Sequence, residues 1–191
     1  MYEDYLTNKT VAIIGPAAYR NKLNQTKIIN SYDIVVRVNK GNTIKAYGTG
    51  TRCNIHYCSP IGEQHFTSEP AWVCSPFSEK IEGNNVKRYI NILRNVTKIH
   101  SNSFRVVNYT TLKELYNILN KRPTCGAVAI FDLLSFDIKE LYISGFTFEK
   151  NNYIKGYPTY QENEYNYEGE REKLIPLLLK DNRVKTRGFN V

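Results

Sequence analysis

Short runs of consecutive apolar residues alternate along this chain with longer segments in which apolar residues recur at helical spacing. The first run, residues 10–14 (TVAII), is followed directly by Gly15-Pro16, which indicates a buried strand that ends in a sharp turn. Further strands, several of them rich in β-branched residues, are predicted at residues 33–38, 53–58, 71–74, 104–109 and 140–144.

Segments with helical spacing of apolar residues separate these strands. Residues 127–134 are apolar on almost every side, which is typical of a helix buried in the core. Thr124 is expected to cap this helix, because a threonine hydroxyl accepts a hydrogen bond from a first-turn N–H. Pro176 is expected to kink the last helix, because proline removes one backbone hydrogen bond. The remaining helices are predicted at 19–30 (Leu23, Ile28 and Ile29 inward), 85–95, 112–119 and 168–180 (Leu174, Leu177 and Leu178 on one face).

Alternating strands and helices predict an α/β fold whose mostly parallel sheet is flanked by helices. A length of 191 residues is enough for one domain with its own core, so residues 1–191 are expected to form a single domain. Ligands of such sheets bind beyond the carboxyl ends of the strands. The positions of interest therefore follow Ile14, Val38, Cys58 and Ser144, together with the start of the helix capped by Thr124.

Composition and charge narrow the function classes. Hydrophobic residues make up 41% and charged residues 23%, which excludes a collagen, a disordered tail or a membrane channel. The net charge of +8 is typical either of an anionic partner, such as a nucleotide, a nucleic acid or an anionic lipid, or of a solvated surface kept soluble by like charge. Because the basic residues are dispersed and no nucleic-acid motif accompanies them, nucleic acid is kept only as a minor alternative.

The N-terminus and the cysteines bear on the compartment. The sequence MYEDYLTNKT has neither the basic region nor the apolar region of a signal peptide, and no apolar run approaches the ~20 residues of a membrane span. No pair of cysteines has CxxC spacing, so buried reduced thiols are expected rather than a zinc site. These features predict a cytoplasmic protein without a membrane span; the four cysteines are Cys53, Cys58, Cys74 and Cys125.

Two predicted strands end in groups that suit an anionic ligand. The turn Gly15-Pro16 could let a phosphate approach the backbone, although it matches neither a dinucleotide-binding nor a P-loop pattern and could be purely structural. Arg37 and Asn39 end the second strand two positions apart, which places a cation and an amide on one face. The alternative for this pair is an edge salt bridge and a turn asparagine.

The segment Thr124-Cys125-Gly126 would present a hydroxyl and unpaired first-turn N–H groups at a helix N-terminus. Such a terminus attracts anions, and a glycine there lets a ligand come close. The alternative is an ordinary cap on a tightly packed helix. The three histidines, His56, His65 and His100, are isolated from one another in the sequence. The sequence contains no D-x-D triplet, which argues against a metal-dependent sugar-nucleotide site.

Three segments, in this order, resemble the motifs of one enzyme family. Residues 11–39 (VAIIGPAAYRNKLNQTKIINSYDIVVRVN) resemble the long sialylmotif of the eukaryotic-type sialyltransferases, glycosyltransferase family 29. Residues 123–146 (PTCGAVAIFDLLSFDIKELYISGF) resemble the small sialylmotif, and residues 168–178 (EGEREKLIPLL) resemble the last motif, whose Glu opens the final helix. The bacterial sialyltransferases of family 42 are resembled more distantly, through the short chain and the helix and strand of the second segment.

The resemblance implies a single-domain, Rossmann-like variant of the A-type glycosyltransferase fold. It implies a metal-independent, inverting transfer from a CMP-activated sugar to a hydroxyl of an unknown glycan or other acceptor, with no cofactor. The donor-binding positions that it implies, with the candidates above, are Gly15, Pro16, Arg37, Asn39, Ser59, Thr124, Cys125, Gly126, Gly145, Phe146, Tyr153 and Tyr157.

The chain also departs from the family. The Gly-Asn-Ser of the first motif is replaced by Gly15-Pro16-Ala17, so one donor contact is lost or moved. The family's general base is a His about five residues before the Glu of the last motif, whereas residues 165–170 contain none. Either another group serves, with His65 preferred over His56 and the loop glutamates (Glu162, Glu164 and Glu168) third, or the protein binds a nucleotide without transferring sugar.

The disulfide that joins the long and small motifs in Golgi members is also missing. Its two positions fall on Val11 and within residues 136–138, where no cysteine stands. Loss of both partners fits a chain that folds in a reducing compartment. We therefore expect a compact cytoplasmic relative from a virus or a microbe.

Overall fold

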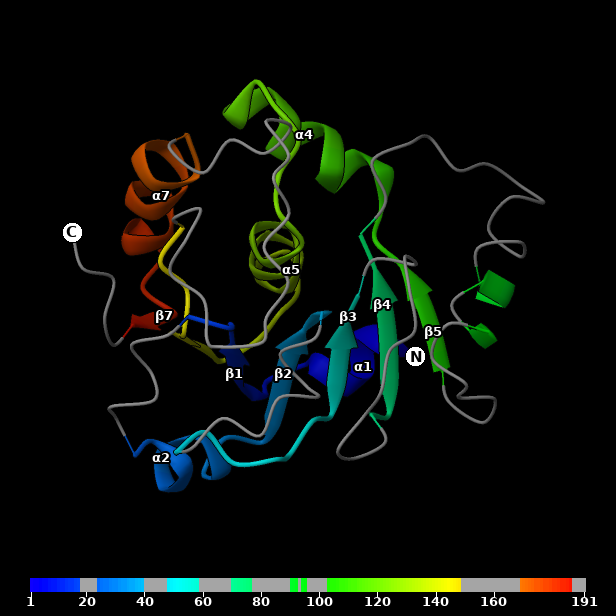
Figure 1. The fold of residues 1–191 in the computed structure, drawn as a ribbon, viewed down its shortest axis with the longest axis vertical. Helices are drawn as coiled ribbons and strands as arrows, with labels where there is room; N and C mark the ends of the chain where they lie inside the picture. The colour runs from blue at the N-terminus through cyan, green and yellow to red at the C-terminus, as the bar shows by residue number, and fades with distance from the viewer. Residues whose placement is uncertain are drawn as a thin grey trace.

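The computed structural model describes residues 1–17, 24–39, 48–58, 70–76, 90–92, 94–95, 103–148 and 169–186. Within these residues seven parallel strands form one sheet in the order β5-β4-β3-β2-β1-β6-β7, which confirms the predicted α/β class (Figure 1). The strands are β1 (Thr10–Ile14), β2 (Ile34–Val38), β3 (Ile55–Tyr57), β4 (Trp72–Ser75), β5 (Ser103–Val106), β6 (Glu140–Ser144) and β7 (Val184–Thr186).

Helices cover both faces of the sheet, because the central strands are apolar on both sides. Val11 and Ile13 of β1 face the main core, whereas Ala12 and Ile14 face a smaller cluster, and all four side chains are fully buried. The short helix α2 (Thr26–Asn30) covers the smaller cluster through Ile29. The main core is covered by α1 (Tyr2–Leu6), α4 (Tyr109–Leu119), α5 (Cys125–Leu134) and the last helix.

The last helix changes type just before Pro176, and the kink expected at this residue stays a prediction. A π-helical segment, η3 (Glu170–Leu174), runs directly into α7 (Ile175–Lys180), which has Pro176 in its first turn. Leu177 is 44% exposed, contrary to expectation, because Ile175 lies on the buried face with Leu174 and Leu178.

Several other expectations are corrected. Ile28 is 37% exposed while its neighbour Ile29 is fully buried, so only one of the two faces the sheet. Helix α1 and strand β7 lie where no element was predicted. Of the helix predicted at 19–30, residues 24–30 are described, and only 26–30 are helical, as α2. Of the helix predicted at 85–95, residues 90–92 and 94–95 are described, and they are helical.

Candidate functional site

The carboxyl ends of β1 and β6 lie side by side at the point where the strand order reverses. Ligands of open α/β sheets bind at such a point. The Gly15 N–H donates to the Ser144 carbonyl at 2.8 Å, and the Ala17 N–H donates to the Gly145 carbonyl at 2.9 Å. A Cβ on Gly15 would lie 2.2 Å from the Gly145 carbonyl oxygen, and Gly145 itself has φ +80°. Both glycines are therefore required by this contact between two backbones.

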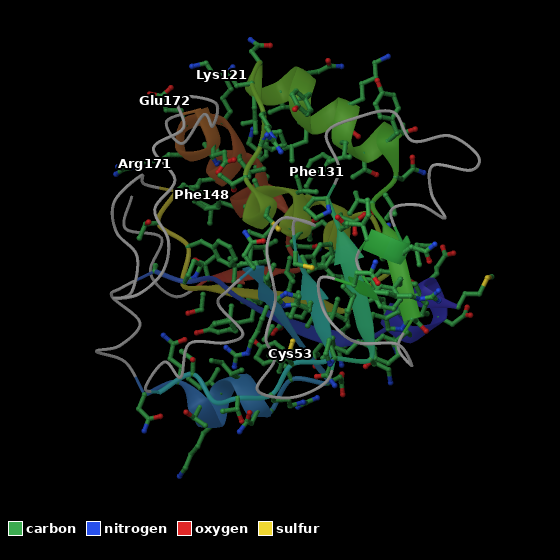
Figure 2. The ribbon with its side chains drawn as sticks, turned by 45° about the vertical axis from the view of Figure 1, so that its right-hand side comes forward. Cys53, Lys121, Phe131, Phe148, Arg171 and Glu172 are labelled. Carbon is green, nitrogen blue, oxygen red and sulfur yellow. The ribbon has the colours of Figure 1, made fainter. Side chains whose placement is uncertain are left out.

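Phe146 fills the space beside the first turn of α5. A Cβ on Gly126 would lie 2.6 Å from Cε1 of Phe146, whose ring stacks on Phe148 at 6.0 Å between centroids. Figure 2 labels Phe148 on the segment that follows β6, beside α5. Gly126 thus admits an aromatic ring of the protein, which accounts for the glycine, and a ligand contact at this residue stays a prediction.

Thr124 caps α5 as predicted and is itself held by the last helix. Its hydroxyl oxygen accepts the Ala127 N–H at 3.2 Å, and its hydroxyl donates to Oε2 of Glu170 at 3.0 Å. The Thr124 N–H donates to Oε1 of the same carboxylate at 2.5 Å. Cys125 donates its thiol to the Tyr57 carbonyl at 3.7 Å, which sets the helix start against the end of β3. By helix geometry the N–H groups of Cys125 and Gly126 have no acceptor within α5.

Glu170 was not among the predicted site residues, although it is the Glu that opens the final helix in the third motif. Its side chain is fully buried. Burial raises the pKa of Glu170 to about 7, and the two hydrogen bonds from Thr124 oppose this rise. The start of α5 therefore carries a carboxyl group that changes charge near neutral pH.

Arg37 is buried, and its guanidinium binds backbone carbonyls. Nε donates to the Arg52 carbonyl at 2.9 Å, and Nη2 donates to those of Thr49 and Gly50 at 2.8 Å each. Burial lowers the pKa of Arg37. These bonds replace the edge salt bridge considered above and fasten residues 49–52 to β2, while donor binding by Arg37 stays a prediction.

Asn39 directly follows β2 and has φ 44°, in the left-handed region that asparagine tolerates better than most residues. Because Asn39 does not have strand geometry, strand alternation does not fix the direction of its side chain. The expectation that Asn39 and Arg37 share one face therefore does not follow from their spacing. Asn39 is half-buried at the carboxyl edge of the sheet, where the donor site was predicted.

His56 lies in the middle of the sheet, in register with Arg37 of β2 and Val73 of β4. Its imidazole is fully buried, so it does not meet a substrate in this conformation, and its catalytic role stays a prediction. The predicted site residues Ser59, His65, Tyr153 and Tyr157, and the loop glutamates, lie outside the described residues.

A polar residue that no sequence signal marked lies beside the end of β6. Gln25 is 1% exposed, and its Oε1 accepts hydrogen bonds of 2.9 Å from the hydroxyls of Tyr142 and Ser144. Its Nε2 has no hydrogen-bond partner among the described residues. Gln25 therefore holds a buried donor near the ends of β1 and β6.

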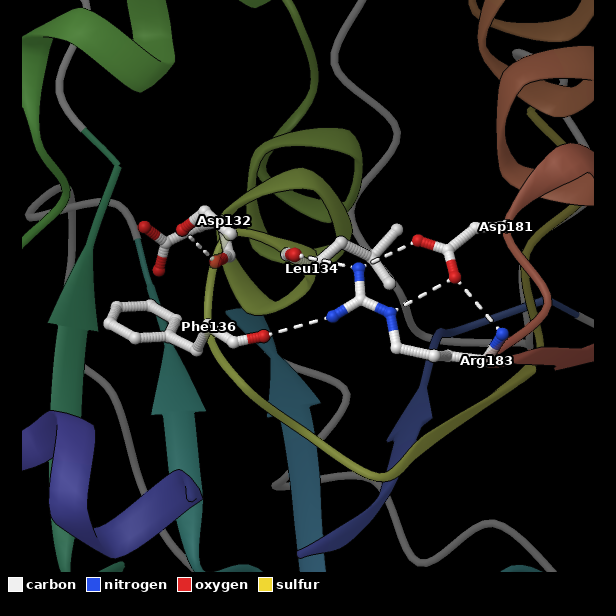
Figure 3. Close-up of polar contacts among 6 residues, drawn as sticks. Asp132, Leu134, Phe136, Asp181 and Arg183 are labelled. Atoms are coloured by element: carbon white, nitrogen blue, oxygen red, sulfur yellow. Dashed lines mark hydrogen bonds and ion pairs between the residues drawn. The ribbon is translucent and has the colours of Figure 1, made fainter. Parts of the chain in front are cut away.

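Several arginines are engaged within the protein. Arg105 forms a two-pronged ion pair with Asp132 at 2.5 and 2.8 Å, and the Tyr57 hydroxyl donates to the same carboxylate at 2.5 Å. Arg183 donates to the carbonyls of Leu134 and Phe136 at the end of α5 and pairs with Asp181 (Figure 3). These cations stabilise the fold, which weakens the inference of a nucleic-acid surface from net charge.

The described residues contain no group of three or more His, Cys, Asp or Glu side chains that could hold a metal ion. All four cysteines are unpaired thiols; Cys53, Cys58 and Cys74 are buried as predicted, whereas Cys125 is half-buried. No helix in the described part of the chain is long and apolar enough to cross a membrane.

The fold is that of the sialyltransferases. A mammalian sialyltransferase in complex with Gal-beta-1-3GalNAc-ortho-nitrophenol aligns with 97% of this chain and 71% of its own, at 14% identity and a TM-score of 0.67. The sialyltransferase CstII from Campylobacter jejuni, in complex with the substrate analogue cytidine-5'-monophosphate, aligns with 96% of this chain and 82% of its own, at 16% identity and a TM-score of 0.61. The alpha-2,3-sialyltransferase Cst-I from Campylobacter jejuni aligns with 94% of this chain and 75% of its own, at 13% identity and a TM-score of 0.65.

No protein-family model matches the chain, and no curated protein sequence matches it. The similarity is thus one of fold, and the predicted resemblance to sialyltransferases is confirmed at that level.

Proposed function

We propose that this chain is a metal-independent, inverting glycosyltransferase that uses a CMP-activated sugar. The observation that carries the proposal is the fold match, which extends over nearly the whole chain and includes a sialyltransferase in complex with cytidine-5'-monophosphate. A second complex of the same enzyme, with CMP-3FNeuAc, supports a CMP-sugar as the class of donor.

The chemistry of the α5 start supports donor binding. The N–H groups of Cys125 and Gly126 and the helix dipole suit an anionic phosphate or sugar carboxylate, so charge on the leaving group can be met without a metal ion. The contact between Gly15 and Gly145 lies at the neighbouring switch point of the sheet.

In the proposed reaction an acceptor hydroxyl attacks the anomeric carbon on the face opposite the nucleotide. The new carbon–oxygen bond forms as the bond to the CMP phosphate breaks, CMP leaves with the bonding electrons, and a base takes the hydroxyl proton. A positioned base contributes roughly 10²–10⁴-fold to rate. His65 is the first candidate for this base, ahead of His56 and the loop glutamates.

The second candidate function is nucleotide binding without sugar transfer. The full burial of His56 favours nucleotide binding without transfer, because a buried imidazole cannot take a proton from an acceptor hydroxyl. Transfer to nucleic acid is a third alternative that rests on net charge alone. The unpaired thiols support the expectation of a reducing, cytoplasmic compartment.

Binding and turnover distinguish these functions. We expect the chain to bind CMP more tightly than UMP or GMP, and to cleave CMP-sialic acid in a single-turnover assay. CMP selectivity without cleavage of any CMP-sugar would leave the nucleotide-binding function, and equal affinity for the three nucleotides would exclude both.

The placement of the nucleotide is tested at Asn39. Asn39→Gly removes the amide but tolerates the left-handed backbone, so CMP binding should weaken by ~1–3 kcal/mol without a folding defect. Asn120→Gly is the matched control, because Asn120 also has positive φ (56°) but ends α4. Equal CMP affinity of the Asn39 variant and wild type would remove Asn39 from the site.

A further inference from the structure

The carboxylate of Glu170 lies at the α5 start, where the proposed function requires an anionic ligand. It receives the Thr124 N–H at 2.5 Å and the Thr124 hydroxyl at 3.0 Å. The hydroxyl oxygen also accepts the Ala127 N–H at 3.2 Å. A threonine hydroxyl has only one hydrogen. While Glu170 is ionised, that hydrogen is committed to Glu170 and Thr124 cannot donate to a ligand.

The charge of Glu170 also opposes a bound anion. A donor phosphate or sugar carboxylate on the N–H groups of Cys125 and Gly126 would share this helix start with a fully buried carboxylate. A proton on Glu170 removes the like charge. The new O–H can then donate to the Thr124 oxygen, which frees the hydroxyl hydrogen of Thr124 for the ligand.

We propose that Glu170 is a positioning residue that couples donor binding to the uptake of one proton. Neutral Glu170 turns the Thr124 hydroxyl toward the anionic group of the donor, and ionised Glu170 turns it away. The inference rests on the proposed function, because it concerns the donor site of that function.

The environment of Glu170 makes this proton available near neutral pH. Burial, the largest cause, raises the pKa of Glu170 to about 7, against the hydrogen bonds from Thr124. Asp132 of α5, the other buried carboxylate among the described residues, is paired with Arg105. Among the described residues, the remaining ionisable groups on the elements packed around Glu170 are Tyr109, Lys113, Glu114 and Tyr116 of α4, Lys121 and Arg122 of the turn after it, Cys125 of α5, and Arg171, Glu172, Lys173 and Lys180 of the last helix.

The sign of the effect on stability follows from this shift. Because the folded-state pKa lies above the ordinary value of 4.5, the unfolded chain ionises first as the pH rises. The stability that neutral Glu170 contributes is fully present below the ordinary pKa of 4.5. It is lost as the pH rises through the folded-state pKa of about 7. Glu170→Gln should abolish this loss, which gives a readout of the proton without ligand.

The binding test uses the methyl phosphodiester of CMP, whose single negative charge does not change between pH 6 and pH 8. We expect the wild type to bind it about tenfold more weakly at pH 8 than at pH 6, as one proton with a pKa near 7 requires. Calorimetry in two buffers of different ionisation enthalpy should show uptake approaching one proton per ligand at pH 8.

Variants separate positioning from structure. Glu170→Gln mimics the neutral acid, so its affinity should be the same at both pH values, within about twofold of the wild type at pH 6. The control Glu172→Gln removes the same charge from an exposed position on the outer side of the last helix, and should keep the tenfold difference (Figure 2). Thr124→Ser should also keep the tenfold difference in affinity, whereas Thr124→Val should weaken binding at pH 6 by threefold or more.

The outcomes distinguish this inference from the function on which it rests. No binding by the wild type at either pH contradicts the proposed function and the inference with it. Equal wild-type affinity at both pH values, or a tenfold difference that persists in Glu170→Gln, overturns the inference alone. Wild-type affinity of Thr124→Val at pH 6 also overturns it, because the hydroxyl would then have no role.

Discussion

Glycines at the α5 start and at the end of β1 serve two different close contacts. A Cβ on Gly15 would lie 2.2 Å from the Gly145 carbonyl oxygen and 2.9 Å from Cδ1 of Phe146, whereas the atoms nearest to a Cβ on Gly126 would all belong to the Phe146 ring. Backbone cannot move aside without disturbing the sheet, but a side chain can be shortened. A smaller side chain at position 146 should therefore relieve a substitution of Gly126, whereas no side-chain change should relieve a substitution of Gly15.

We expect Gly126→Ala to lower the free energy of unfolding by about 1–3 kcal/mol, the usual cost of overpacking. Most of this loss should disappear in a Phe146→Leu background, whereas Gly15→Ala should cost about 3 kcal/mol or more in either background. Urea unfolding of the four variants and their parents measures the coupling. Additive costs of Gly126→Ala and Phe146→Leu would show that the ring does not limit this position.

At the scale of elements, Arg183 joins the last strand to the end of α5. It donates to the carbonyls of Leu134 at 2.9 Å and Phe136 at 3.0 Å (Figure 3). The Leu134 carbonyl is one of those that a helix C-terminus leaves without an acceptor role inside the helix. Arg183→Gln should destabilise the fold by about 1–3 kcal/mol.

The control for this variant is Lys185→Gln, which removes the same charge from an exposed position of β7. Its effect should stay within about 0.5 kcal/mol. Thermal unfolding of both variants checks the prediction, and equal losses of stability would assign the effect of Arg183 to charge rather than to its hydrogen bonds.

Elements with a strong local pattern were predictable from the sequence. The strand at 140–144 and the buried helix capped by Thr124 lie where apolar runs and the cap indicate. Strand β7, with three residues and half-exposed ends, has no such pattern, because its stability comes from pairing with β6. The exposure of Leu177 could not be foreseen, because the π-helical segment before it changes the helical register.

The need for glycine at Gly15 and Gly126 was predictable, because a motif marks both positions, while their contacts with a ligand stay predictions. The bonds of Arg37 to carbonyls of residues 49–52 depend on a loop whose path carries no periodic signal. Gln25 escaped notice because its partners on β6 lie more than a hundred positions away in the sequence. Such contacts follow from the topology of the sheet and not from any local pattern.

For the whole molecule, the proposed function predicts that catalysis needs no divalent cation. Transfer from a CMP-sugar should keep its rate in excess EDTA, because hydroxyls and backbone N–H groups would stabilise the leaving phosphate. Initial rates with EDTA, with and without added Mn²⁺ or Mg²⁺, measure this. Activity that EDTA abolishes and Mn²⁺ restores would contradict the metal-independent mechanism.

The strand order has a consequence for how the chain reaches its folded state. The central strand β1 pairs with β6, so that Thr10 is opposite Glu140. During synthesis from the N-terminus, one edge of this largely apolar strand has no partner until most of the chain has emerged from the ribosome. Pairings this distant in sequence slow folding, because the loop must close before the contact forms. A nascent chain that stops before β6 would thus expose the strand to aggregation and to chaperones.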